Sequence, residues 1–220
     1  MIEQKKTAII IGATGLIGRY LTRFLLKNQE YSLVKVFARS STDIEDEKLQ
    51  EYMVDFDQLA NWQEELKGDE LFSTMGTTRK KAGKQGQYKV DFTYQYEVAK
   101  AAANNGVSKY LLVSSAGANA ESNSFYSRIK GELEANVSAL DFKYISIFRP
   151  SILVGQRSDN RLGEKIGIKV GQWLTRLPAF KKYRPIKGET VAKAMMNAAT
   201  GIPSNKVKIY AWDEIHLMGL

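Results

Sequence analysis

Three glycines spaced three residues apart constrain the fold of this chain more than any other feature of its sequence. Gly12, Gly15 and Gly18 directly follow the short apolar run 8–11, which is typical of a strand buried on both faces of a parallel sheet. Apolar residues then recur at helical spacing, so the pattern predicts a strand that turns sharply into a helix. We expect Gly12 to permit the tight turn, Gly15 to let phosphates approach the backbone, and Gly18 to allow close helix–strand packing.

This turn has the chemistry of a pyrophosphate site. Backbone N–H groups and the positive end of the helix dipole converge there, and both favour an anion. The spacing is GxxGxxG and no GK[ST] follows, which excludes a P-loop. The alternative is an ordinary strand–helix turn whose glycines serve packing only.

Strand-like and helical segments alternate along the rest of the chain. The predicted strands cover 33–38, 50–54, 71–75, 109–113, 144–148 and 207–210, and the predicted helices cover 59–66, 88–104 and 190–199. We therefore predict the α/β class: a Rossmann-type doubly wound parallel sheet in a single domain, 1–220, with 151–220 as a small C-terminal substrate-side extension. The stretch 79–87 is expected to be a mobile loop. The amphipathic segment 163–177 could be a substrate lid, a core helix or a dimer helix.

Composition narrows the chemistry. Cysteine is absent and His216 is the one histidine, which excludes disulfides, thiolate catalysis, Ser–His triads and histidine-cluster metal sites. We expect no metal and a cytoplasmic location. The apolar run near the N-terminus is too short for a membrane span, so we expect no membrane association. The net charge of +8 is spread along the chain, and a solvated surface is favoured over nucleic-acid binding.

The end of the second predicted strand bears on the choice of cofactor. NAD-binding proteins usually place an acid there, whereas this chain has Arg39 followed by Ser40. A guanidinium can pair with a 2′-phosphate, so we predict a preference for NADP(H) over NAD(H). The alternative is a surface arginine at a strand end.

The next two predicted strands end in further candidates. Asp55 and Phe56 could contact the adenine, and Asp57 could cap the following helix, which is the safer interpretation for Asp57. Gly76 follows the fourth strand and would let the backbone approach the cofactor.

Residues suited to proton transfer follow the fifth predicted strand. Ser114 and Ser115 end that strand, and Tyr126 and Lys130 lie four apart on the next helix, which places them on one face. A phenol has a pKa near ~10, and a nearby cation lowers it. Lys130 could also bind the nicotinamide ribose, and a serine could bind the substrate oxygen; Ser114 is favoured and Ser115 remains open. We predict a Ser/Tyr/Lys relay. The alternative is a Tyr/Lys pair that is decayed or only holds the cofactor.

Several motifs together resemble one protein family. The order of 12–18 (GATGLIG), Tyr-x-x-x-Lys and 148–150 (FRP) resembles the atypical short-chain dehydrogenase/reductase superfamily. Within it, 76–83 (GTTRKKAG), 114–118 (SSAGA) and 125–134 (FYSRIKGELE) are similar to the small oxidoreductases typified by the Tat-interacting protein. The likeness covers nearly the whole chain, including IHLMG near its end.

The resemblance implies a Rossmann-type domain that binds NADPH. It implies cofactor contacts at Thr14, Gly15, Leu16, Ile17, Arg39, Ser40, Met75, Gly76, Leu153 and Arg161. It also implies Tyr126 as the proton donor and Lys130 as its partner. The sequence departs from the family pattern at Leu16 and Ile17, where polar residues can occur, and at Ser40, where a second arginine can occur.

Three functions are compatible with these residues. The favoured one is NADPH-dependent reduction of a small carbonyl compound, since 151–220 is short for gripping a nucleotide sugar. The others are an NADP(H)-sensing protein without turnover, and an epimerase or isomerase that uses transient hydride transfer. A homodimer or a protein partner is possible, because the predicted helix 88–104 carries an alanine-rich stretch suited to close packing.

Overall fold

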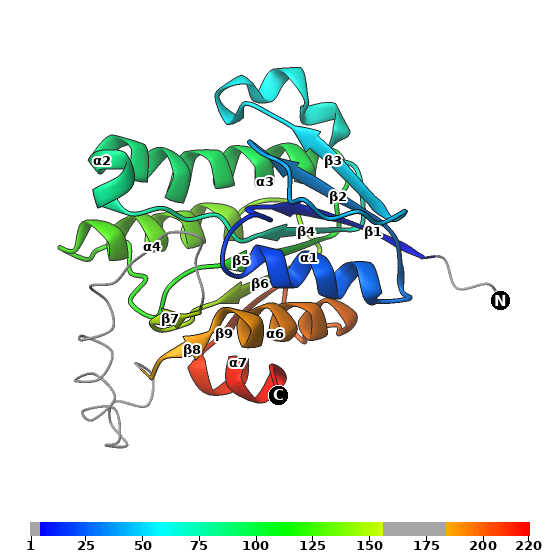
Figure 1. Ribbon diagram of the computed structural model, residues 1–220. Helices are drawn as coiled ribbons and strands as arrows, with labels where there is room; N and C mark the ends of the chain where they lie inside the picture. The colour runs from blue at the N-terminus through cyan, green and yellow to red at the C-terminus, as the bar shows by residue number, and fades with distance from the viewer. Residues whose placement is uncertain (1–4, 156–183) are drawn as a thin grey trace.

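The structure is a computed structural model that describes residues 5–155 and 184–220. Its centre is a seven-stranded, wholly parallel sheet (Figure 1) with the order β3-β2-β1-β4-β5-β6-β9. The strands are β1 (Lys6–Ile11), β2 (Tyr31–Ala38), β3 (Leu49–Met53), β4 (Glu70–Ser73), β5 (Lys109–Val113), β6 (Tyr144–Phe148) and β9 (Val207–Tyr210). The predicted doubly wound sheet is confirmed. Strand order reverses between β1 and β4, and ligands of such sheets bind at that crevice.

The first strand shows why helices must cover both faces of the sheet. Successive strand residues point to opposite faces. Accordingly, Ala8 and Ile10 join one buried cluster, and Ile9 and Ile11 join the other. A run that is apolar at every position is stable only in a sheet covered on both sides.

Helices supply that cover (Figure 1). One face packs against α1 (Gly18–Lys27), α6 (Gly188–Thr200) and α7 (Trp212–Met218), and the other against α3 (Tyr94–Asn104) and α4 (Phe125–Ser138). A separate parallel pair, β7 (Leu153–Val154) and β8 (Ile186–Lys187), lies beyond β6 in the chain. Within 5–155 and 184–220, every helix falls short of the length and apolarity needed to cross a membrane. Arg161 and the segment 163–177 lie outside the described residues.

Two local predictions are wrong. The expected loop 79–87 is helical: α2 (Arg79–Tyr88) continues through a π-helical turn, η3 (Lys89–Thr93), into α3, with a kink at Gly83. Contacts outside the segment stabilise this helix, because Lys84 lies over the ring of Phe125 and Gln87 is buried.

The predicted helix 59–66 is also wrong. The structure has two short 3₁₀ segments there, η1 (Phe56–Asn61) and η2 (Gln63–Glu65). The cap is Asp55, whose carboxylate accepts the N–H of Asp57 at 2.9 Å. Asp57 instead pairs with Lys89 at 2.6 Å and accepts the hydroxyl of Tyr94 at 2.8 Å, so long-range partners decide its role.

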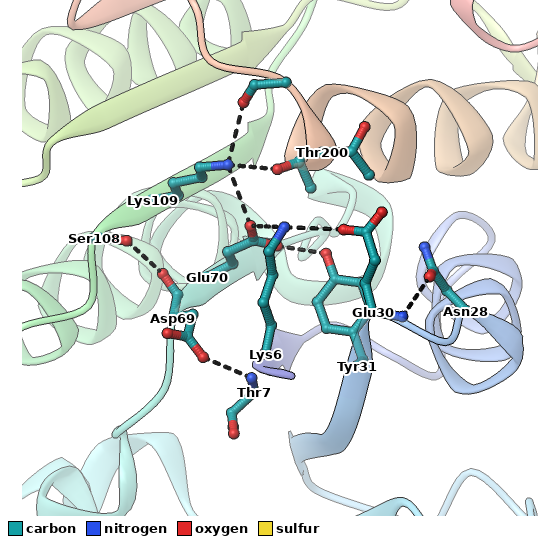
Figure 2. A network of polar contacts seen from close by, with 12 residues as sticks. Lys6, Thr7, Asn28, Glu30, Tyr31, Asp69, Glu70, Ser108, Lys109 and Thr200 are labelled. Atoms are coloured by element: carbon teal, nitrogen blue, oxygen red, sulfur yellow. Dashed lines mark hydrogen bonds and ion pairs between the residues drawn. The ribbon is translucent and has the colours of Figure 1, made fainter. Parts of the chain in front are cut away.

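A buried charge network ties the amino-terminal ends of the strands together (Figure 2). The carboxylate of Glu70 accepts the hydroxyl of Tyr31 at 2.5 Å and lies 3.3 Å from Lys6 and 3.4 Å from Lys109. Burial and the Glu70 charge raise the pKa of Tyr31 far above its ordinary value, so this phenol remains a donor. Lys109 also donates to the Ala199 carbonyl at the end of α6. The network thus joins four strands and a helix at the edge opposite the strands' carboxyl ends.

We expect Glu70→Gln to lower the free energy of unfolding by about 3 kcal/mol, because it leaves two partly buried ammonium groups without their shared counter-charge. Urea unfolding measures this effect. The matched control is Glu30→Gln, which removes the more exposed partner of Lys6 and should cost less than about 1 kcal/mol. Equal losses in the two variants would show that burial of Glu70 does not matter.

Candidate functional site

The glycine turn brings three backbone segments into direct contact. Gly12 has φ +82°, and a Cβ there would lie 2.7 Å from the Met75 nitrogen. A Cβ on Gly18 would lie 2.2 Å from the Gly12 carbonyl oxygen, and one on Gly15 would lie 3.1 Å from the same oxygen. The expected tight turn and close helix–strand packing are therefore confirmed.

The start of α1 is open to an anion. Among the described residues, no side chain caps this helix and no acid occupies its first turn, so its dipole and N–H groups are not neutralised locally. Thr74 holds the turn from the β4 side by donating to the Gly12 carbonyl at 3.0 Å. Thr14 is exposed on the same turn. The geometry suits a pyrophosphate bound by backbone groups.

The apolar residues Leu16 and Ile17 have a packing role. Ile17 is buried in the core beneath α1. Cβ atoms on Gly155 and Gly188 would come within 2.7 and 2.8 Å of the Leu16 side chain, so Leu16 joins the glycine turn to the C-terminal part of the chain. Leu153, on β7, is partly buried against the same core. A cavity of about 350 Å³ opens beside this junction, lined in part by Tyr20, Val154 and Lys187.

The loop after β2 is organised by an acid that the sequence did not single out. Glu51, on β3, accepts the hydroxyl of Ser41 at 2.8 Å and both the N–H and the hydroxyl of Thr42, at 2.8 and 2.5 Å. Partial burial raises the pKa of Glu51, but these hydrogen bonds outweigh it and hold the pKa below its ordinary value. Arg39 and Ser40 remain exposed at the carboxyl end of β2. No pattern in the sequence signals this contact.

The predicted adenine contacts occupy different environments. Phe56 is buried and packs edge-on against Trp62, whereas Asp55 is exposed but engaged in capping η1. Met75 is partly buried and Gly76 exposed in the segment that follows β4. All four residues lie beyond the carboxyl ends of β3 and β4, at the edge that carries the glycine turn.

The proposed proton-transfer residues differ in burial. Tyr126 is 40% exposed, and Lys130, one turn later on α4, is 2% exposed. Ser114 is buried, and its hydroxyl finds no hydrogen-bond partner within the described part of the chain. Ser115 is partly buried. Leaving a buried hydroxyl without a hydrogen-bond partner costs free energy, so a ligand that accepted this hydrogen bond would be stabilised.

The residue paired with Lys130 is Asp91, which no sequence motif identifies. Its Oδ1 lies 3.0 Å from the Lys130 ammonium, and its Oδ2 accepts the backbone N–H of Thr77 at 3.1 Å. Asp91 is 1% exposed and belongs to η3. Regular helical periodicity cannot reveal a side chain placed by a π-helical turn, so the sequence held no usable signal for this pair.

Comparisons with known proteins agree with this geometry. A protein family described as NAD(P)H-binding matches residues 12–176. "Protein FMP52, mitochondrial" of Candida glabrata is 37% identical over 89% of this chain and 85% of its own length. "Protein HTATIP2" of Rattus norvegicus is 32% identical over 94% of this chain and 86% of its own.

Solved structures share the fold at low identity. The Bordetella bronchiseptica enzyme WbmH in complex with NAD⁺ superposes with a TM-score of 0.72 at 17% identity, over 94% of this chain and 76% of its own. MoeE5 in complex with UDP-glucuronic acid and NAD gives 0.70 at 16% identity, over 97% and 81%. These similarities show a shared Rossmann-type fold.

The expected cytoplasmic location is contradicted. Relatives in Candida glabrata, Debaryomyces hansenii and Candida albicans are all named as mitochondrial. The lack of cysteine shows only that the protein needs no disulfides, so it could not distinguish one reducing compartment from another.

We expect Gly18→Ala to lower the free energy of unfolding by about 2–3 kcal/mol, because the new methyl group would meet the Gly12 carbonyl rather than a mobile side chain. Thermal or urea unfolding measures the loss. In the control Gly201→Ala, the methyl group would lie 3.6 Å from its nearest neighbour, and we expect a change below about 1 kcal/mol. Full stability of the Gly18 variant would contradict the tight backbone packing.

Proposed function

Because this chain belongs to the NAD(P)H-binding protein family, we propose that it is an oxidoreductase that uses NADPH to reduce a small carbonyl compound. One observation carries the proposal: a buried ammonium, Lys130, lies one helical turn from the solvent-accessible phenol of Tyr126. The helix that holds both follows β5, whose carboxyl end lies on the same edge of the sheet as the glycine turn. A cofactor gripped at that turn would extend toward this pair.

Three parts of the chain would hold NADPH. Backbone N–H groups at the start of α1 would bind the pyrophosphate. Arg39 and Ser40 would bind the 2′-phosphate, because both are exposed at the carboxyl end of β2 and a guanidinium can pair bidentately with a phosphate. Lys130 would donate to the nicotinamide ribose.

The chemistry requires one hydride and one proton. Bound NADPH supplies the hydride to the carbonyl carbon. The buried hydroxyl of Ser114 would hold the carbonyl oxygen, and Tyr126 would donate its phenolic proton to that oxygen as the C=O bond becomes C–O–H. The resulting phenolate would regain a proton from water, since Tyr126 is exposed.

For the cofactor, we expect Arg39→Ala to weaken NADPH binding about tenfold and NADH binding less than twofold, because only NADPH carries the 2′-phosphate. Fluorescence titration of each reduced cofactor measures both constants. Arg23→Ala, on the exposed surface of α1, removes the same charge and should change neither. A wild-type protein that binds NADH as tightly as NADPH would contradict the preference.

For catalysis, we expect Tyr126→Phe to lower kcat about 100-fold or more while NADPH binding stays within about twofold, because only the proton donor is lost. NADPH oxidation against a panel of aldehydes and ketones measures kcat. Tyr88→Phe is the matched control, since Tyr88 is also exposed and helical. NADPH binding without turnover of any panel member would favour the sensor alternative.

A further inference from the structure

The ion pair between Lys130 and Asp91 is among the most deeply buried charges of the described chain. Both side chains are nearly inaccessible to water, and their charged atoms lie 3.0 Å apart. An ammonium at this depth is stable only with a counter-charge, since desolvation of an unpaired ion costs several kcal/mol. The position of the Lys130 ammonium therefore depends on Asp91.

Asp91 is itself fixed by the segment that follows β4. The N–H of Thr77 donates to its Oδ2, and a Cβ on Gly76 would lie only 3.5 Å from its Oδ1. This is the segment in which Met75 and Gly76 are predicted to border the cofactor. One carboxylate thus connects that segment to α4, which carries the proposed proton donor.

The pair leaves Lys130 able to bind a ligand. An ammonium has three N–H donors, and the contact with Asp91 accounts for one direction. The remaining donors suit two vicinal ribose hydroxyls. Asp91 has no such spare capacity on its Oδ2, where the backbone N–H of Thr77 is bound. Asp91 would consequently act through Lys130 rather than on the cofactor directly.

We propose that Asp91 is a positioning residue: it holds the Lys130 ammonium in place for the nicotinamide ribose of the bound cofactor. The inference rests on the proposed function. It makes a specific statement about the two halves of the cofactor. Binding of the nicotinamide half depends on Asp91, whereas binding of the adenosine half, at the glycine turn and the loop after β2, does not.

Asp91→Asn tests this statement, because the amide keeps the size of the side chain and an acceptor for Thr77 but removes the charge. Calorimetric titration of the full chain would compare NADPH with adenosine 2′,5′-bisphosphate, which lacks the nicotinamide riboside. We expect NADPH binding to weaken about tenfold or more, the size of one charge-assisted contact. Bisphosphate binding should stay within about twofold, which also reports that the variant is folded.

Glu134→Gln is the matched control. Glu134 is a buried acid on α4 whose carboxylate accepts hydrogen bonds from Arg149, so its loss should leave both ligands unchanged. The double variant Asp91→Asn/Lys130→Gln should bind NADPH no more weakly than Lys130→Gln alone, because one residue acts through the other.

Several outcomes would overturn the inference. Equal weakening of both ligands by Asp91→Asn would show a general structural role, and unchanged NADPH binding would show no role. Additive losses in the double variant would show that Asp91 acts independently of Lys130. If the wild-type protein binds neither ligand, the proposed function is overturned and this inference with it. If the wild-type protein binds both, any change in the Asp91→Asn variant reports on the role of Asp91 alone.

Discussion

Contact between bare backbone atoms at Gly12 and Gly18 is the constraint on which the site depends. Because neither residue has a Cβ, β1 turns directly into α1 and the chain after β4 lies against the turn. From there, contacts run without a gap through Met75 and Gly76 to Asp91 and then to Lys130. The place where a pyrophosphate would bind and the ammonium proposed for the ribose are thus positioned by one packed segment.

The two edges of the sheet use charge differently. At the amino-terminal edge, the carboxylate of Glu70 is shared by two lysines and a tyrosine, and this network joins secondary-structure elements (Figure 2). At the carboxyl edge, counting only residues 5–155 and 184–220, Lys130 pairs with one carboxylate and the hydroxyl of Ser114 has no hydrogen-bond partner. A ligand that accepted hydrogen bonds from Lys130 and Ser114 would complete the polar contacts at the carboxyl edge.

The sequence predicts the sheet better than it predicts the connections. The bounds of β5, β6 and β9 agree with the structure, because aliphatic and aromatic residues dominate each of these short runs. The helix at 79–87 and the 3₁₀ segments at 56–65 are stabilised by distant partners, such as Phe125 for Lys84, which local patterns do not contain.

The same distinction applies to the candidate site. The glycine turn, Tyr126 and Lys130 are local motifs with a fixed spacing, so the sequence identifies them. Asp91 and Glu51 take their roles from folding, because each acts on residues of another segment. Asp91 is 39 positions from Lys130, and Glu51 is 10 positions from Ser41. A single sequence carries no record of such pairing. The sequence therefore identifies the motifs but not the acids that orient them.

The apolar residues Leu16 and Ile17 depart from the family pattern, in which polar residues can occur there. This departure does not weaken the case for a dinucleotide at the turn. A polar side chain at Leu16 would lie between Gly155 and Gly188, where the backbone leaves room only for close apolar packing. Ile17 likewise faces the buried core. Since a pyrophosphate is bound by N–H groups and the helix dipole, side chains at these positions are free to serve packing. The apolar residues therefore attach the C-terminal part of the chain to the turn, and the backbone remains available to the cofactor.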